Sequence, residues 1–245
     1  MRVKLICCDV FLRPVSAFVA VSPNIIDVEY VPMLAHTDPA RLRAELQTRI
    51  DAAAALRKYD MFVLAYGLCG NAVTGLTCPV PLVIPRIHDC CTMFMGSREK
   101  YLAEFGNRLS MRWCSCGYYE RCYMDERTTD YVISNRDTNP EFLALVEQYG
   151  QENAEYVWET MHPEIETPEA AYIVLEGFEI PGRLEGFSEE VEKQGKTLVT
   201  LNGDLTFLRD LINGPWDSAR FQTVMPGQKI AAVYDMEHVI TAVDA

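Results

Sequence analysis

The chain has 245 residues, of which 49% are apolar and 23% are charged, and its formal net charge at pH 7 is −13. That length is enough to bury a core in one large domain or in two small ones. The acidic excess argues against nucleic acid and anionic membrane as partners, because both would repel the surface. Asp9, Arg13 and Pro14 interrupt the apolar stretch near the start, so we expect no membrane span and no signal peptide, and hence a cytoplasmic protein.

Buried strands that alternate with helices are predicted in the first half of the chain. The predicted strands are Val3–Cys7, Val28–Val31, Met61–Tyr66 and Leu82–Ile84. Asp38 is expected to cap a helix that has Pro39 in its first position and ends near Tyr59. Ser97 is expected to cap another helix, which runs toward Phe105. Near-continuous apolar strands separated by helices indicate a parallel sheet with both faces covered.

The second half repeats this α/β pattern. Helices are predicted from Asn139-Pro140-Glu141 to Trp158 and after Asp204, and strands at Tyr172–Leu175, Thr197–Leu201, Phe221–Val224 and Ile230–Val233. No regular element is predicted for Trp113–Tyr123. We therefore expect an α/β protein with a Rossmann-like parallel sheet and helices on both faces. It forms a single domain over residues 1–245, in which two similar lobes, 1–110 and 135–245, would be joined by a cysteine-rich segment at 111–134.

The cysteines are the most informative residues of the sequence. There are nine of them, an odd number and a high one for a cytoplasmic chain. In a reducing compartment such cysteines are more often metal ligands, catalytic thiols or small buried hydrophobes than disulfides. Cys7, Cys69 and Cys90 each lie at or just beyond the end of a predicted strand. Carboxyl ends of parallel strands meet at one edge of a sheet, where ligands bind, so these three thiols are expected to converge.

A metal site is the first interpretation of this convergence. Three thiolates suit zinc or an iron–sulfur cluster, and His36, which follows the second predicted strand, is the obvious fourth ligand. The residues expected to contact a bound cofactor are Gly67, Gly70, Asn71, Arg86 and Asp89. Two alternatives stay open. An exposed cysteine at a helix N-terminus could have a lowered pKa and act as a nucleophile, or the cysteines could fill the core.

A second group of thiols comprises Cys114, Cys116 and Cys122. Their spacing matches none of the standard paired zinc motifs. They could bind a metal on their own, add thiols to the first site, or form a redox-sensitive loop. For Cys78, a place in the core or in a loop is favoured. Glycine-rich nucleotide loops and the nucleophile elbow of serine hydrolases are missing from the sequence, so their chemistry is unsupported.

The sequence also resembles a known family, on the segments Tyr66-Gly67-Leu68-Cys69-Gly70-Asn71 and Val83-Ile84-Pro85-Arg86-Ile87-His88-Asp89-Cys90. Leu34-Ala35-His36, Gly96-Ser97 and Asn213-Gly214-Pro215-Trp216 add to the resemblance, which spans most of the chain. The family is the one called domain of unknown function 1638. Its members often occur in anaerobic bacteria and archaea beside corrinoid-dependent methyl-transfer systems.

This resemblance implies a role in anaerobic one-carbon metabolism, with a corrinoid protein or a methyltransferase as partner. Three hypotheses follow. The protein could be a metal-dependent transferase that moves a methyl group to or from a thiol or a corrinoid. It could instead be a non-catalytic accessory protein that holds a metal, cluster or corrinoid for its partner, or a thiol enzyme without metal.

Overall fold

Parallel sheets form the framework of the protein in the computed structural model, which describes residues 1–106, 111–123, 140–161, 167–233 and 238–245. The larger sheet has the strand order β2 (Ile25–Val31), β1 (Arg2–Cys8), β3 (Met61–Ala65), β4 (Leu82–Pro85) and β8 (Phe221–Val224). The first four strands of this order are parallel, and β8 runs antiparallel to β4. The predicted α/β class with a mostly parallel sheet is confirmed.

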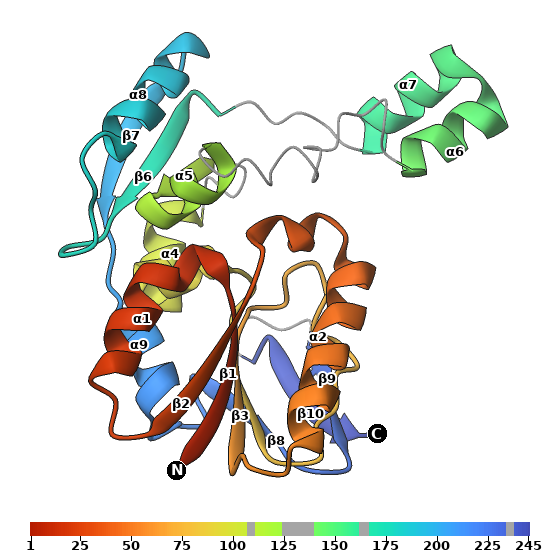
Figure 1. The fold of residues 1–245 in the computed structure, drawn as a ribbon. Coiled ribbons are helices and arrows are strands. Elements are labelled where there is room, and N and C mark those ends of the chain that lie inside the picture. Colours follow the sequence, from red (N-terminus) through yellow and green to blue (C-terminus); the bar gives the residue numbers. More distant parts are fainter. Residues whose placement is uncertain (107–110, 124–139, 162–166, 234–237) are drawn as a thin grey trace.

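Helices cover both faces of this sheet, which explains why its central strands β1, β3 and β4 are buried along most of their length. Figure 1 shows α1 (Leu12–Ala20) and α9 (Thr206–Asn213) on one face and α2 (Pro39–Ala55) on the other. The helix α2 begins where predicted, because the Asp38 side chain accepts a hydrogen bond from the Arg41 N–H at 2.9 Å. Its apolar stripe is buried against the sheet and consists of Leu42, Leu46, Ile50 and Ala53.

A smaller parallel sheet contains β5 (Arg112–Ser115), β6 (Glu169–Val174) and β7 (Thr197–Asn202). The helix α8 (Arg183–Lys193) packs on it over a small core of Cys114, Ala170, Tyr172, Phe187 and Val191. The expectation that Trp113–Tyr123 is irregular was wrong, because β5 is followed directly by α5 (Cys116–Tyr123). Long-range packing against two cores orders this segment, and local propensity does not reveal such packing. The division into lobes remains a prediction.

The remaining elements connect or flank these sheets. They are η1 (Asp9–Phe11), η2 (Met33–Thr37), α3 (Cys90–Met95), α4 (Arg98–Phe105), α6 (Pro140–Tyr149), α7 (Gln151–Met161), β9 (Gln228–Ala232) and β10 (Ile240–Asp244). Ser97 caps α4 as predicted, whereas α1 and α3 were not predicted. Asn139, the predicted start of α6, lies outside the described residues. Within the described part of the chain, the helices fall short of the length and apolarity that a membrane span requires.

Candidate functional site

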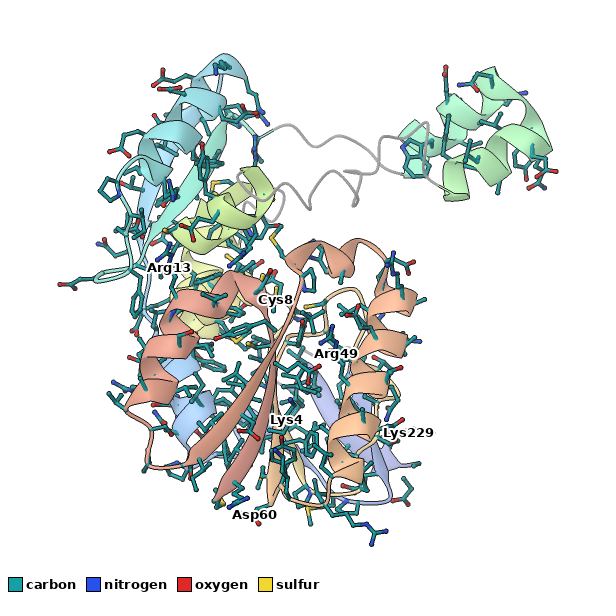
Figure 2. The ribbon with its side chains drawn as sticks, viewed as in Figure 1. Lys4, Cys8, Arg13, Arg49, Asp60 and Lys229 are labelled. Carbon is teal, nitrogen blue, oxygen red and sulfur yellow. The ribbon has the colours of Figure 1, made fainter. Side chains whose placement is uncertain are left out.

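A cavity of about 270 Å³ lies at the carboxyl edge of the larger sheet. It opens beside the ends of β1 and β3, where the strand order changes direction, and such switch points are where open α/β sheets bind ligands. Figure 2 shows Cys8 at this end of β1. The residues that line the cavity are Cys8, Phe11, Pro32, Met33, His36, Leu42, Ala65, Tyr66, Gly67, Cys69, Gly70, Asp89, Cys90, Trp113 and Tyr118.

Cys8 supplies the thiol from β1, in place of the predicted Cys7. Successive side chains of a strand point to opposite faces, so these two neighbours separate. Cys7 is fully buried in the hydrophobic core, whereas Cys8 lines the cavity. The predicted ligand Cys7 therefore lies away from the cavity, and its neighbour Cys8 is the cysteine of this strand end that lines it.

Cys69 is positioned by a left-handed turn after β3. Three successive residues, Cys69, Gly70 and Asn71, have φ angles of 45°, 66° and 67°. A left-handed conformation costs a residue other than glycine on the order of 1–2 kcal/mol, and such strain often accumulates at functional sites. The Cys69 N–H donates to the His88 carbonyl at 3.0 Å, which ties this turn to the segment after β4. The turn therefore brings Cys69 beside the segment that leads to Cys90.

Gly67 permits this close approach of two loops. A Cβ atom on Gly67 would lie 2.7 Å from the carbonyl group of His88 and from the Asp89 nitrogen. No larger residue fits there without moving the backbone of one loop away from the other. Gly67 was predicted to contact a bound cofactor, and in the structure its close neighbour is the protein's own backbone at His88 and Asp89.

Cys90 is the first residue of α3, and Asp89 caps that helix. The Asp89 carboxylate accepts a hydrogen bond from the Thr92 N–H at 3.2 Å, and burial raises its pKa. A helix N-terminus normally lowers the pKa of a cysteine. Here burial dominates, and it raises the pKa of the Cys90 thiol well above its ordinary value. This shift is opposite in direction to the one that would activate Cys90 as a nucleophile.

His36 enters the cavity wall from η2. Its Nδ1–H donates to the Met33 carbonyl at 2.5 Å, which leaves Nε2 with a free lone pair on the same ring. Burial lowers the pKa of His36, so the imidazole is neutral at pH 7. A metal-binding histidine commonly has this form, a neutral ring whose second nitrogen donates to a carbonyl.

Aromatic side chains from the smaller sheet close the cavity. Trp113 on β5 and Tyr118 on α5 both line it, with their ring centroids 4.8 Å apart. The Trp113 ring packs on Phe94 at 5.9 Å, and Phe94 packs on Phe11 at 4.7 Å. These ring contacts join the two sheets and give the cavity an apolar wall. The sequence analysis did not predict this wall.

The helix α5 is held against the larger sheet by close packing and by charge. A Cβ atom on Gly117 would lie 2.2 Å from the Val10 carbonyl oxygen, so α5 touches η1 there. The Arg121 guanidinium lies 3.5 Å from the buried carboxylate of Asp9. Asp9 also accepts a hydrogen bond from the Met33 N–H at 2.8 Å. One carboxylate thus connects α5 with the segment that carries His36.

Tyr66 contributes a buried hydroxyl to the cavity wall. Tyr66 directly follows β3, is 3% exposed and lines the cavity. Its hydroxyl oxygen makes no hydrogen bond to any residue that the structure describes, and an unpaired buried hydroxyl costs roughly 1–3 kcal/mol in a protein interior. Burial, with the nearby Cys8, Cys7 and Cys69 as further causes, raises the pKa of Tyr66 well above its ordinary value. The sequence reading did not single out this residue.

The three cavity thiols influence one another. Burial is the main cause that raises their pKa values, for Cys69 to about 12, and the charge of a neighbouring cysteine adds to the effect at Cys8 and Cys90. Cys69 and Cys90 are partly exposed, whereas Cys8 is buried. Among the described residues, no group of three His, Cys, Asp or Glu side chains is arranged so that it could hold a metal ion.

Several other predicted residues lie outside the cavity. The Asn71 carbonyl accepts a hydrogen bond from Arg43 at 2.8 Å, so Asn71 fixes the turn. The Arg86 guanidinium donates to the Ser218 carbonyl at 2.9 Å and to Gln222 Oε1 at 2.6 Å, and it lines a separate hollow. Of the second cysteine group, Cys114 and Cys116 are buried and Cys122 is partly exposed. Cys78 is buried in the core, which confirms the favoured interpretation.

The fold and the cavity define an α/β protein with three thiols gathered at the switch point of its main sheet. The family model described as protein of unknown function (DUF1638) matches residues 30–212, so the chain belongs to this family. Neither a curated protein nor a solved structure matches the chain. The matched segment includes His36, Cys69 and Cys90, whereas Cys8 precedes it.

Proposed function

We propose that the protein binds a soft metal ion in this cavity through the thiolates of Cys8, Cys69 and Cys90, with His36 as the fourth ligand. The observation that carries this proposal is that four donors from four separate segments line one cavity. Three sulfurs and one imidazole nitrogen form a donor set that suits zinc. His36 supports the assignment because it is neutral and its Nδ1 is already occupied by a carbonyl.

The electrostatics favour a metal over a free catalytic thiol. A cysteine acts as a nucleophile in its thiolate form, and burial keeps these thiols protonated at neutral pH. A coordinated cation reverses this balance, because it deprotonates a thiol outright. The raised pKa values therefore weigh against the metal-free thiol enzyme.

Coordination requires the thiols to turn toward one another, since the described side chains do not form a ready metal cluster. The partly exposed Cys69 and Cys90 face open space and can change rotamer. Structural zinc sites in small peptides contribute about 10–16 kcal/mol of binding free energy at neutral pH. That is several times the cost of rotating a few side chains, which is about 0.5–1.5 kcal/mol even for a strained one.

The role that we infer for the metal is methyl transfer in corrinoid-linked one-carbon metabolism, as the family resemblance implies. Four protein ligands fill a tetrahedral zinc shell, so in such a transfer one of them would leave the metal and the deprotonated acceptor thiol would take its place. That thiolate would attack the methyl group of a methylcobalt(III) corrinoid and form an S–C bond. The Co–C bond breaks and leaves its electron pair on cobalt, as cobalt(I), so no further oxidant or reductant takes part. In the non-catalytic alternative, the protein holds its metal or corrinoid for a methyltransferase.

Elemental analysis with a visible spectrum, on protein purified without oxygen, tests the metal site. We expect one zinc ion per chain, and a visible absorption band would identify an iron–sulfur cluster instead. The metal should disappear in a Cys69→Ser, Cys90→Ser double variant and persist in Cys78→Ser, where the thiol is buried away from the cavity. Metal-free wild-type protein, or a double variant that keeps its metal, would contradict the proposal.

The transfer role has its own test. Zinc-loaded protein is mixed anaerobically with methylcobalamin and ethanethiol, and cobalt(I) is followed by its visible absorption. Cobalt(I) that forms with the wild type and not with the double variant supports the transferase. Stable copurification with a corrinoid protein, without turnover, supports the accessory role instead.

A further inference from the structure

Among the described residues that line the cavity, Tyr66 carries a buried hydroxyl without a hydrogen-bond partner. This hydroxyl is buried and makes no hydrogen bond within the described part of the chain, although buried polar groups in folded proteins are nearly always paired. Tyr66 lines the cavity and its hydroxyl lies near Cys8 and Cys69, which line it too, so a small shift of the side chain lets a molecule inside the cavity supply the missing partner. A bound molecule with a hydrogen-bond acceptor would remove the cost of this unpaired group.

The charge of the residues that line the cavity further narrows the class of molecule that can bind there. None of the described lining residues is a lysine or an arginine, and Asp89 is among them. A phosphate or carboxylate would therefore enter without a cation to compensate its lost hydration. The net charge of the chain, −13, also repels anions. An uncharged molecule is favoured.

The shape and chemistry of the wall favour an apolar body. Phe11, Trp113 and Tyr118 offer ring faces, and Met33 and Leu42 add aliphatic surface. A dry cavity of about 150 Å³ is known to accept benzene. The volume here is about 270 Å³, which leaves room for a ring with a short substituent.

We propose that this cavity binds a small uncharged molecule that has a ring-sized apolar body and one hydrogen-bond acceptor, which the Tyr66 hydroxyl holds. This inference goes beyond the metal proposal, since it needs the cavity and the hydroxyl but no metal ion.

Three probes of similar size separate the contributions. Acetophenone has a carbonyl acceptor, ethylbenzene has none, and benzoate carries a charge. Their affinities for the full chain are measured by calorimetry, without oxygen and with a chelator present, so that the result is independent of any metal. We expect acetophenone to bind tightest and benzoate weakest, because the first satisfies Tyr66 and the last lacks a cation.

Tyr66→Phe is the decisive variant, because it removes the hydroxyl and keeps the ring. Acetophenone should bind this variant about three- to tenfold more weakly, while the affinity for ethylbenzene stays the same. Tyr59→Phe is the matched control, because the Tyr59 hydroxyl is already bonded to Asp27 on the surface. Equal acetophenone affinity in wild type and Tyr66→Phe would overturn the proposal, as would a wild type that binds none of the probes.

A second measurement protects the test against misfolding of the variant. Acetophenone should slow the alkylation of Cys69 in wild-type protein, because both occupy the same cavity. Benzoate at the same concentration should leave the rate unchanged, and equal protection by both probes would contradict the inference. Protection of metal-free protein alongside a failed zinc assay would refute the metal site and leave this inference standing.

Discussion

Two pairs of adjacent cysteines divide between the core and the cavity. Cys8 and Cys90 line the cavity, whereas their neighbours Cys7 and Cys91 are both 0% exposed in the core. The side chains have the same chemistry and nearly the same place in the sequence. What separates them is the side of the backbone from which each thiol leaves. The comparison teaches that backbone orientation decides which cysteine of each pair lines the cavity, and it supplies Cys8 and Cys90 each with a natural control.

The largest expected effect comes from replacing each member of the first pair, Cys7 and Cys8, with serine. Cys8→Ser should weaken zinc binding by at least about a hundredfold, since losing an outer partner of a ligand already costs 10–100-fold. Cys7→Ser should leave zinc affinity unchanged but lower the free energy of unfolding by about 1–3 kcal/mol, because it buries a hydroxyl without a partner. Zinc titration and urea denaturation measure the two quantities. Equal zinc loss in both variants would break the comparison.

Cys7 and Cys8 also show which features of the site can be predicted from the sequence and which cannot. The apolar runs identify the strands because both sheet faces are covered, and the strand ends then predict where ligand groups gather. Alternation implies that Cys7 and Cys8 face opposite sides, but both sides of such a strand are apolar. Which side adjoins the cavity depends on helices and loops from later parts of the chain that pack against this strand.

Other parts of the site differ in how readable they are. The role of Tyr66 could have been predicted from the sequence. A tyrosine directly after a fully apolar strand is expected to be buried, and its hydroxyl then needs a hydrogen-bond partner. Trp113 and Tyr118 could not be predicted as lining residues, because they lie on β5 and α5, and local sequence does not reveal that these elements pack against the larger sheet. The position of Arg86 outside the cavity could not be predicted, because its acceptors come from distant segments, among them Ser218 and Gln222.

A smaller effect is expected from Gly67→Ala, which acts on the cavity through the backbone. The added methyl group would overlap the His88 carbonyl group and force apart the loops that carry Cys69 and Cys90. We expect a loss of about 1–3 kcal/mol in the free energy of unfolding, as for other overpacked sites, and weaker zinc binding with it. Thermal denaturation and zinc titration report the two effects.

Gly150→Ala is the matched control for this substitution. Unlike Gly67, Gly150 has a positive φ angle of 77°, and a Cβ atom there would meet nothing within 4 Å. Its cost is therefore confined to the backbone, at about 1–2 kcal/mol. A similar loss of stability with unchanged zinc affinity would show that Gly67 acts on the site itself. Zinc loss in both variants would instead make metal binding a general readout of stability.

The smallest expected effect is the pH dependence that His36 adds to the stability of the metal-free protein. Burial lowers its pKa in the folded state, so the unfolded chain binds the proton more readily. Stability is therefore complete above the unfolded-state pKa of about 6.5 and is lost as the pH falls below it. His36→Gln should remove this component, which amounts to about 1 kcal/mol or less for a partly buried group. The raised pKa of Asp89 acts in the opposite direction but is common to both proteins, so it cancels in their difference.

Urea midpoints of the wild type and His36→Gln at pH 7.5 and 5.5 measure the contribution of His36. Parallel pH profiles for the two proteins would mean that His36 is not held neutral. In that event its assignment as a ligand would lose its main electrostatic support, while the three thiols would keep theirs.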